Sequence, residues 1–543
     1  MTTASFSSLD FSLDADPELL AHVNPANWIN PKPQSAYDLV VIGGGAAGLV
    51  SAAGAAGLGA RVALVERNRL GGDCLNTGCV PSKALAAFAR SAVGKTAADR
   101  LESARLHLRH KRLEISVHDK TERWNALGID LFFGQASFAN PKTITVEGIS
   151  LPFKRAALCS GASPALPSIA GLAECSPLTT DTFFDLNRLP ASLVIVGAGP
   201  VGVELAQSLA RLGCAVTLVE RGPSILARED ASAAQLVGQT LQADGVSLCT
   251  QSTLQRVEKT SSGIRVHLLQ QGTQATHTLE AEAILVATGR APNTAGLHLE
   301  RAGIELNGLF PRVDPFLRTT NPCVYAAGDV IGPPYLTHRS GAHAAALIQN
   351  ALFAHPLGFG KSNTHTLVIP RCLHTDPAIA QVGLTEQEAT LQGIPHEVLH
   401  ISASSSDRIQ LEEECGWLKL ILAKGTDKLL GATVVSKHAG ELIFPAVEML
   451  QKGRGLKSLF GLILPYPTRM EIWNRAALTW RARRFAESSF TQRLVRLLTG
   501  FEKKTDPVMP NYATPQLRNS PTPQVRGGAA ELRSWNRKVS LPG

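Results

Sequence analysis

The stretch YDLVVIGGGAAGLVSAAGAAGLGARVALVER, residues 37–67, predicts a buried strand, a glycine turn, a helix of small residues and a second strand ending in an acid. It recurs without a gap as ASLVIVGAGPVGVELAQSLARLGCAVTLVER, residues 191–221, with 14 of 31 positions identical. A single glycine-rich turn is weak evidence, because such turns also occur for packing reasons. Two copies with the same spacing predict an α/β chain with two dinucleotide sites.

The glycines of each turn have separate roles. The first permits the tight turn, the second lets the backbone approach a pyrophosphate, and the third lets the helix pack close to the strand. An acid 18 residues after the third glycine can accept hydrogen bonds from an adenosine ribose. The two sets are Gly43, Gly45, Gly48 and Glu66 in the first copy, and Gly197, Gly199, Gly202 and Glu220 in the second.

Three further segments fit the same plan. The segments 155–161 and 284–290 each predict a buried strand that runs into a glycine turn, at Gly161 and Gly289. The segment 324–329 ends a strand with Asp329 beside a glycine. An acid there can hold a ribityl hydroxyl, although acids also favour turns for local reasons.

GGDCLNTGCVPSK, residues 71–83, places Cys74 and Cys79 five positions apart. The spacing does not suit zinc, and no other Cys or His lies between residues 23 and 106. An iron–sulfur site would need a cysteine at position 82, which is Ser. A static bridge remains open as an alternative. However, Pro81 predicts a helix starting just after Cys79, and a helix N-terminus lowers a thiol pKa, which favours a reactive pair.

Composition limits the class of protein. A chain of 543 residues with 44% hydrophobic and 18% charged residues predicts a globular protein of three or four domains. Its nine scattered cysteines favour a reducing compartment over a secreted disulfide framework. The first twenty residues lack the basic and apolar parts of a signal peptide, and no apolar run reaches 18 residues. We therefore expect a cytoplasmic protein with no transmembrane segment.

The C-terminal end of the chain carries the whole net charge of +8. Residues 471–543 hold 13 Lys and Arg against five Asp and Glu, so the rest of the chain is neutral and predicts no nucleic-acid partner. A basic helix is expected over Ile472–Leu498, with Trp473 and Trp480 on one face. Such a helix can contact an anionic membrane peripherally, but we favour a solvated helix that caps a dimer. Residues 503–543 are expected to be disordered.

The segment GGDCLNTGCVPSK resembles the redox-active signature of the class I pyridine nucleotide–disulfide oxidoreductases, which include lipoamide dehydrogenase, glutathione reductase and mercuric reductase. The resemblance covers about residues 37–480. It implies FAD at the first dinucleotide site, NAD(P)H at the second, and a Cys74–Cys79 disulfide that opens and closes. It further implies that Cys79 faces the flavin and that Cys74 exchanges with substrate. Lys83 would lie near flavin N5, Glu204 near the nicotinamide, and Asp329 on the ribityl chain.

The resemblance also implies the architecture, namely two Rossmann-like domains, for FAD and NAD(P), and a C-terminal α+β dimerisation domain in a homodimer. The expected limits are 1–36 for an N-terminal extension, 37–190 and 315–362 for the FAD domain, 191–314 for the NAD(P) domain, 363–502 for the dimerisation domain and 503–543 for the tail. Glu220 suits the ribose hydroxyls of NADH and repels a 2′-phosphate, so NADH is moderately preferred, with Arg221 as a partial offset.

One position departs from the family's disulfide reductases. They carry a His-Pro segment whose His exchanges protons with the substrate, oriented by a Glu five residues later, and this chain has Tyr466-Pro467 and Glu471. Tyr is a poor proton shuttle at neutral pH. The chain therefore resembles the mercuric-reductase-like branch most, with Hg(II) or a small molecule as acceptor and no resident metal. A thiol-disulfide reductase and a soft-metal-binding or redox-sensing flavoprotein remain alternatives. Cys372 and His374 are a further candidate ligand pair, for which packing is favoured.

Overall fold

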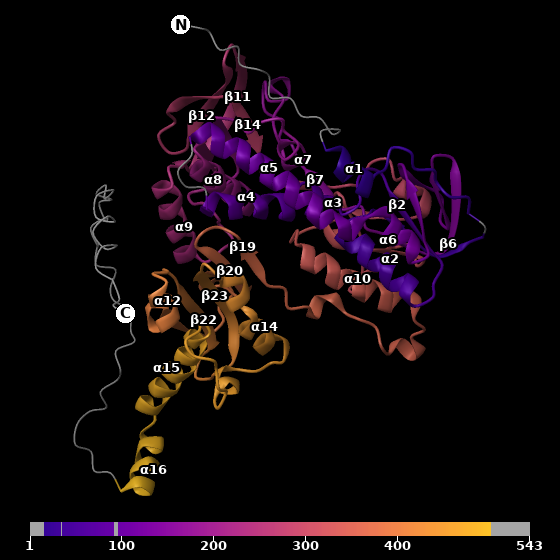
Figure 1. The fold of residues 1–543 in the computed structure, drawn as a ribbon. Helices are drawn as coiled ribbons and strands as arrows, with labels where there is room; N and C mark the ends of the chain where they lie inside the picture. Colours follow the sequence, from indigo (N-terminus) through magenta and orange to yellow (C-terminus); the bar gives the residue numbers. More distant parts are fainter. Residues whose placement is uncertain (1–15, 34, 92–95, 501–543) are drawn as a thin grey trace, which may run out of the picture.

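Two sheets with parallel central strands carry the two glycine motifs in the computed structural model, which describes residues 16–33, 35–91 and 96–500 (Figure 1). The first sheet has the order β3-β2-β1-β6-β5-β4, with β18 also paired to β6. The second has the order β10-β9-β8-β14, and all its pairs are parallel. The first sheet's strands are β1 (Tyr37–Ile42), β2 (Val62–Glu66), β3 (Ile129–Phe133), β4 (Ala136–Asn140), β5 (Thr143–Val146), β6 (Ile149–Leu158) and β18 (Val324–Ala326). The second's are β8 (Ser192–Val196), β9 (Ala215–Val219), β10 (Ser247–Cys249) and β14 (Ala283–Val286).

A small-residue helix follows the first strand of each motif, α2 (Ala46–Gly57) in one and α8 (Pro200–Leu212) in the other. Helix α10 (Thr337–Leu352) packs on α2 so closely that a Cβ on Gly54 would lie 2.4 Å from Ile348 Cδ1. Small side chains in α2 therefore permit the contact of two helices that are far apart in sequence.

Two helices after the cysteine motif join the two halves. Helices α4 (Cys79–Ser91) and α5 (Ala97–Ser116) extend from the first sheet toward α8 (Figure 1). Leu85 of α4 and Leu108 of α5 are fully buried in the same core as Leu205 and Leu209 of α8. The redox segment is thereby packed against the second dinucleotide unit.

The C-terminal part is a five-stranded antiparallel sheet of order β19-β20-β23-β22-β21, and one face of it packs on α13, α14 and α15. Its strands are β19 (Arg371–Leu373), β20 (Ala378–Gly383), β21 (His396–Ser402), β22 (Trp417–Ala423) and β23 (Leu429–Ser436). Its helices are α11 (Glu386–Leu391), α12 (Asp407–Leu411), α13 (Ala439–Leu442), α14 (Phe444–Gln451), α15 (Glu471–Glu487) and α16 (Ser489–Thr499). These observations confirm the expected fold class of two dinucleotide-binding units and an α+β C-terminal domain.

The expectation of one helix over Ile472–Leu498 is wrong. Helix α15 ends at Glu487, and Ser488 starts α16 by accepting a hydrogen bond from the Thr491 amide at 3.2 Å. The cap replaces the helical hydrogen bonds that a continuous helix would need at that point. Trp473 and Trp480 are both buried in the C-terminal core and present no face to solvent.

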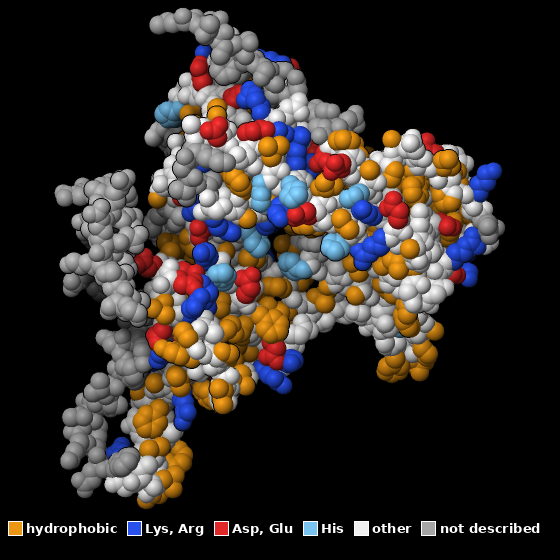
Figure 2. All heavy atoms as spheres, in the orientation of Figure 1, with side chains coloured by type: hydrophobic (Ala, Val, Ile, Leu, Met, Phe, Trp, Pro, Cys, Tyr) orange, Lys and Arg blue, Asp and Glu red, His pale blue; other side chains and the backbone are white. Residues whose placement is uncertain are grey.

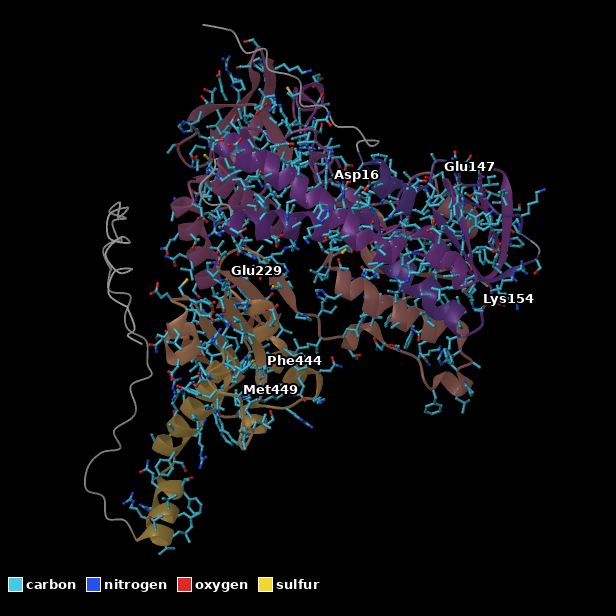
Figure 3. The ribbon with its side chains drawn as sticks, in the orientation of Figure 1. Asp16, Glu147, Lys154, Glu229, Phe444 and Met449 are labelled. Atoms are coloured by element: carbon cyan, nitrogen blue, oxygen red, sulfur yellow. The ribbon has the colours of Figure 1, made fainter. Side chains whose placement is uncertain are left out.

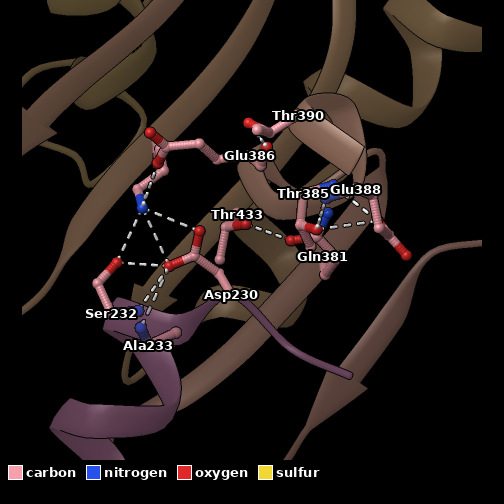
Figure 4. A network of polar contacts seen from close by, with 10 residues as sticks. Asp230, Ser232, Ala233, Gln381, Thr385, Glu386, Glu388, Thr390 and Thr433 are labelled. Carbon is pink, nitrogen blue, oxygen red and sulfur yellow. Dashed lines mark hydrogen bonds and ion pairs between the residues drawn. The ribbon is translucent and has the colours of Figure 1, made fainter. Parts of the chain in front are cut away.

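Ion pairs link the second dinucleotide unit to the C-terminal domain. Lys419 on β22 is buried and donates to both carboxylate oxygens of Asp230, at 3.1 and 2.9 Å, and to Ser232 (Figure 4). Burial favours a raised pKa for Asp230, but bonds from Ser232 and Lys419 bring it below the ordinary value. Glu229, labelled in Figure 3, pairs with Arg371 on β19 at 3.5 Å. These ion pairs act together with an apolar core in which Ile379, Trp417 and Val435 of the C-terminal sheet pack with residues of the second unit.

The remaining elements complete the units. They are α1 (Pro17–Val23), α3 (Gly72–Asn76), α6 (Thr121–Ala126), α7 (Thr180–Phe183), α9 (Ala231–Ala243), β7 (Ala162–Pro164), β11 (Ser252–Thr260), β12 (Gly263–Gln270), β13 (Thr276–Ala281), β15 (Arg290–Pro292), β16 (Leu306–Asn307), β17 (Phe310–Pro311) and eight 3-10 helices of three or four residues in the described chain. The expected disordered tail, 503–543, lies outside the described residues.

Candidate active site

The two glycine loops have the same backbone geometry. Gly43 and Gly197 both have φ +104°, and an added Cβ would lie 2.4 Å from the Cys159 carbonyl oxygen and 2.6 Å from that of Ala287. Both positions therefore require glycine, because other residues rarely adopt that conformation and have no room there. A Cβ on Gly48 or Gly202 would lie 1.8 or 2.0 Å from the carbonyl oxygen of the first glycine of its own loop.

The acids at the ends of the second strands also match. Glu66 Oε2 accepts a hydrogen bond from the Gly44 amide at 2.6 Å, and Glu220 Oε2 accepts one from the Ala198 amide at 2.9 Å. Burial raises the pKa of Glu66, and the Gly44 amide opposes that shift. Each carboxylate thus lies against its own glycine loop, where the ribose of a dinucleotide would approach it.

The loops fit a pyrophosphate. Helices α2 and α8 begin after Gly45 and Gly199 with no side-chain cap, whereas Thr96 and Asp230 cap α5 and α9. First-turn amides without a side-chain partner, at the positive end of the helix dipole, suit an anion. FAD and a nicotinamide dinucleotide therefore fit the residues present at the two loops.

Three more predicted cofactor residues are Gly161, Gly289 and Asp329. Gly161 has φ +70°, and its carbonyl accepts a hydrogen bond from the Asn293 amide at 3.0 Å. Gly289 has φ +152° and accepts one from the Ala165 amide at 3.0 Å. Burial raises the pKa of Asp329, and the guanidinium of Arg290 opposes this shift. A pocket beside the first loop is lined by residues that include Gly43, Glu66, Gln135, Ser160, Asn293 and Leu297.

Cys74 and Cys79 lie together at the start of α4. Cys74 is on the short helix α3, Cys79 is the first residue of α4, and both are free thiols that are hydrogen-bonded to each other. This bond lowers the pKa of Cys79 to about 6 against the effect of burial, and Thr337 and Lys83 contribute. The same bond, followed by burial, raises the pKa of Cys74 well above its ordinary value. The pair thus holds one proton, on Cys74, with Cys79 as thiolate.

Lys83 and Glu204 form a contact that the sequence alone does not predict. Lys83 Nζ lies 2.7 Å from Glu204 Oε2, which joins α4 to α8, and Glu204 Oε1 accepts a hydrogen bond from the His374 amide at 2.8 Å. Burial lowers the pKa of the His374 side chain and raises that of Cys372 to about 12. A thiol that keeps its proton is a poor soft-metal ligand, so a packing role for Cys372 is favoured.

A buried arginine stabilises the segment that joins the two cysteines. Arg112 on α5 is fully buried and donates to the Asn76 carbonyl oxygen at 3.0 Å and to Asp185 at 2.8 Å. Arg69 donates to the other oxygen of Asp185 at 2.7 Å. Asn76 lies between the two cysteines, so this cluster fixes the loop that joins them. The sequence feature that indicates a buried Arg112 is its position on α5. It lies four residues after Leu108, the last member of the buried stripe Leu101, Ala104 and Leu108.

Tyr466 and Glu471 do not bond to each other in the chain. The exposed Tyr466 donates its hydroxyl to Asp407 at 2.8 Å, and this bond raises the pKa of Tyr466. Glu471 accepts a hydrogen bond from Ser406 at 3.4 Å. Within one chain, Glu471 therefore makes no hydrogen bond that would orient the Tyr466 ring as predicted. Asp407 bonds to the Tyr466 hydroxyl instead.

Two negative findings apply to the described residues alone. No three His, Cys, Asp or Glu side chains gather there into a group that could hold a metal ion. None of the helices in the same ranges combines the length and apolar character needed to cross a membrane.

Comparison with known proteins agrees with this geometry. The model of the pyridine nucleotide–disulphide oxidoreductases matches residues 37–351, and that of the family's dimerisation domain matches residues 369–477. The chain is 34% identical to a mercuric reductase of Staphylococcus aureus over 82% of each chain. It is 31% identical to a dihydrolipoyl dehydrogenase of Trypanosoma brucei brucei over 81% of this chain and 96% of the other.

A solved structure agrees as well. The Cu(II) complex of the HOCl-induced flavoprotein disulfide reductase RclA from Escherichia coli superposes with a TM-score of 0.73 at 28% identity, over 80% of this chain and 98% of that one. The match of both family models over most of the chain, together with the repeated glycine loops and the paired cysteines, shows that the chain belongs to the class I pyridine nucleotide–disulfide oxidoreductase family of flavoproteins.

Proposed function

We propose that the chain is an FAD-dependent NAD(P)H oxidoreductase that passes electrons through Cys74 and Cys79 to an acceptor, with Hg(II) as the favoured acceptor. A flavin held at the first glycine loop would supply the two-electron chemistry that links the nicotinamide to the disulfide. The observation that carries the proposal is the placement of the free thiols Cys74 and Cys79 together at the start of α4. The domain limits given above are part of the proposal, as is a cytoplasmic homodimer.

The proton balance of the pair fits this reaction. Reduction of the disulfide by two electrons breaks the S–S bond and needs one proton to give one thiol and one thiolate. Oxidation of NAD(P)H supplies two electrons and one proton. The proton stays on Cys74, whose pKa is raised, and Cys79 remains the thiolate, whose pKa is about 6. Lys83 supports the thiolate with its positive charge, and Glu204 keeps Lys83 in place at 2.7 Å.

Tyr466 favours a metal over a disulfide as acceptor. Reduction of a disulfide substrate requires a proton for the leaving thiolate, and the bond to Asp407 raises the pKa of Tyr466 above that of an ordinary phenol. Hg(II) needs two electrons and no proton at the metal, and a phenol oxygen can serve it as a weak ligand. Cu(II), with which the RclA protein forms a complex, is a second candidate and needs one electron per ion.

Acceptor screening tests the proposal. We expect purified holoprotein to oxidise NADH with Hg(II) at least tenfold faster than with glutathione disulfide or lipoamide, a difference of about 1.4 kcal/mol. Excess metal should inhibit, because soft thiolate ligands hold Hg(II) tightly. Tyr466→His should raise disulfide turnover, with Asp407 or Glu471 to orient the ring. Fast disulfide turnover unchanged by Tyr466→Phe contradicts the proposal. Absence of steady NADH oxidation with every acceptor favours a redox-sensing or metal-binding flavoprotein.

Spectroscopy tests the roles of the two thiols. Reduction should produce a long-wavelength charge-transfer band from the Cys79 thiolate to oxidised flavin. Cys79→Ser should abolish the band, and Cys74→Ser should show it without reductant. A plain flavin spectrum for Cys74→Ser means that the roles are assigned wrongly.

A further inference from the structure

Helix α16 extends beyond the part of the chain that matches the family. The match to the dimerisation domain ends at residue 477, and α16 covers Ser489–Thr499. The helix projects away from the C-terminal sheet at the end of α15 (Figure 1). None of its residues is buried, whereas α15 buries Trp473 and four other residues in the core. Packing against the residues that the structure describes therefore does not explain the apolar residues of α16.

The apolar residues of α16 lie on one side. At 100° per residue, Phe490, Leu494, Leu497 and Leu498 fall within an arc of about 100°. Their exposed fractions are 75, 42, 81 and 75%. Figure 2 shows this hydrophobic surface at the lower end of the molecule. An apolar stripe of this width is what a helix buries against another apolar phase.

The charge on and around α16 is positive. Arg493 and Arg496 border the apolar arc on one side, and the helix contains no acid. The described residues 471–499 hold six arginines and two glutamates. A second copy of α16 would bring these arginines together without a carboxylate between them, which opposes self-association. An anionic surface complements both the charge and the apolar arc.

We propose that α16 docks the protein on an anionic phospholipid membrane. Phe490, Leu494, Leu497 and Leu498 enter the boundary between headgroups and acyl chains, and the helix lies in the plane of the membrane. Arg493 and Arg496 remain at the level of the phosphates. Two copies in the proposed homodimer strengthen binding, because the second helix binds at a high effective concentration. The docking itself does not depend on the acceptor.

Vesicle sedimentation of the full-length holoprotein tests the proposal. We expect most of the protein to sediment with vesicles of phosphatidylcholine and phosphatidylglycerol, and little with phosphatidylcholine alone. High salt should weaken binding, because surface charges are screened. Phe490→Glu/Leu497→Glu should reduce binding by about tenfold or more. Arg493→Gln/Arg496→Gln should reduce binding to anionic vesicles and remove its salt dependence.

Matched controls distinguish binding through α16 from nonspecific adsorption to the vesicles. Leu391→Glu replaces a leucine that is 87% exposed on α11, and it should leave sedimentation unchanged. NADH oxidation and the melting temperature should be unchanged in every variant, since α16 buries no residue. A Phe490→Trp variant should show a blue-shifted emission with anionic vesicles only.

Several outcomes overturn the proposal. These are absence of sedimentation, equal binding to neutral and anionic vesicles, and binding that survives Phe490→Glu/Leu497→Glu or is lost in Leu391→Glu. If the double variant changes the oligomeric state in solution, α16 is a contact between proteins and the membrane proposal fails. None of these results bears on the proposed electron transfer, which is measured separately by NADH oxidation.

Discussion

The two glycine loops agree in backbone geometry and differ in what lies over them. In each loop a carbonyl oxygen accepts a hydrogen bond from an amide in the segment after the second strand. The Gly71 amide donates to Gly44 at 2.8 Å, and the Leu226 amide donates to Ala198 at 2.9 Å. Only the first loop is then covered at its second glycine, where an added Cβ on Gly45 would lie 3.6 Å from the Gly72 Cα. An added Cβ on Gly199 meets nothing within 4 Å. A covered loop suits a cofactor that stays bound, and an open loop suits one that exchanges at every turnover.

The largest effect is expected from valine at the second glycine of each loop. Gly45→Val adds Cγ atoms to a Cβ that already contacts the Gly72 Cα at 3.6 Å, so we expect protein with less than about a tenth of the normal flavin and a lower melting temperature. Gly199→Val meets only open space, so flavin content and melting temperature should stay normal. Its KM for the nicotinamide should rise about tenfold or more, because the side chain blocks the pyrophosphate. Flavin loss of equal size in both variants contradicts the comparison.

A buried arginine distinguishes the two halves in stability. Arg112→Met removes the buried partner of the Asn76 carbonyl and leaves Asp185 with Arg69 alone, so it should lower the free energy of unfolding by about 3 kcal/mol. Arg211 in the second half bonds Asp244 and Asp376 but is partly exposed, so Arg211→Met should cost about 1 kcal/mol. Urea unfolding measures both. Equal losses show that the cluster behind the redox loop is no more important than an ordinary surface pair.

The repeated motif predicted most of the fold, because each glycine that it requires is required by local geometry. Gly43 and Gly197 are fixed by their own φ angle and by the next strand, so the pattern carries the information. A lowered pKa for Cys79 was also expected, but from its place at a helix start, whereas its largest cause is the hydrogen bond from the nearby Cys74. Such features depend on residues close together in sequence.

Features that depend on distant residues were not predicted. Lys83 meets Glu204, 121 positions away, and Arg112 meets Asp185, 73 positions away. The residues next to Lys83 or Arg112 in the sequence do not indicate which distant acid each one contacts. The break at Ser488 was missed because both sides of it read as helix, and only the cap and the burial of α15 reveal the end.

The thiols of the two halves should differ in pH response. The pKa of Cys79 is lowered to about 6, so its thiolate persists down to that pH and falls about tenfold per unit below it. Alkylation of Cys79 in the reduced enzyme by iodoacetamide should therefore rise up to about pH 6 and level off above. Burial raises the pKa of Cys214 to about 12. Cys214 should therefore remain unlabelled between roughly pH 5 and 9, the range over which the labelling is run. Mass spectrometry identifies the labelled residues. A midpoint near 9 for Cys79 contradicts the assignment.

The smallest effect is expected in nucleotide choice. Wild-type enzyme should prefer NADH moderately, because Glu220 repels a 2′-phosphate. Glu220→Ala should shift the ratio of kcat/KM toward NADPH by about tenfold, the size of one hydrogen bond to a charged group. Glu66→Ala should lower flavin content and leave the NADH to NADPH ratio unchanged. Native preference for NADPH by about tenfold or more would show that Arg221 reaches the phosphate.

The ion pairs between the second dinucleotide unit and its neighbours limit how this enzyme can be recombined. Glu204 binds both Lys83 of the redox helix and the amide of His374, and Asp230 binds Lys419 of the C-terminal sheet. A unit grafted from a relative would leave the buried Lys419 with Glu386 of its own domain, at 3.3 Å, as its remaining carboxylate unless it brought an acid to the place of Asp230. Chimeras that preserve both acids should assemble, and random exchanges at the same boundaries should not. Natural drift faces the same condition, so these pairs should change together or not at all.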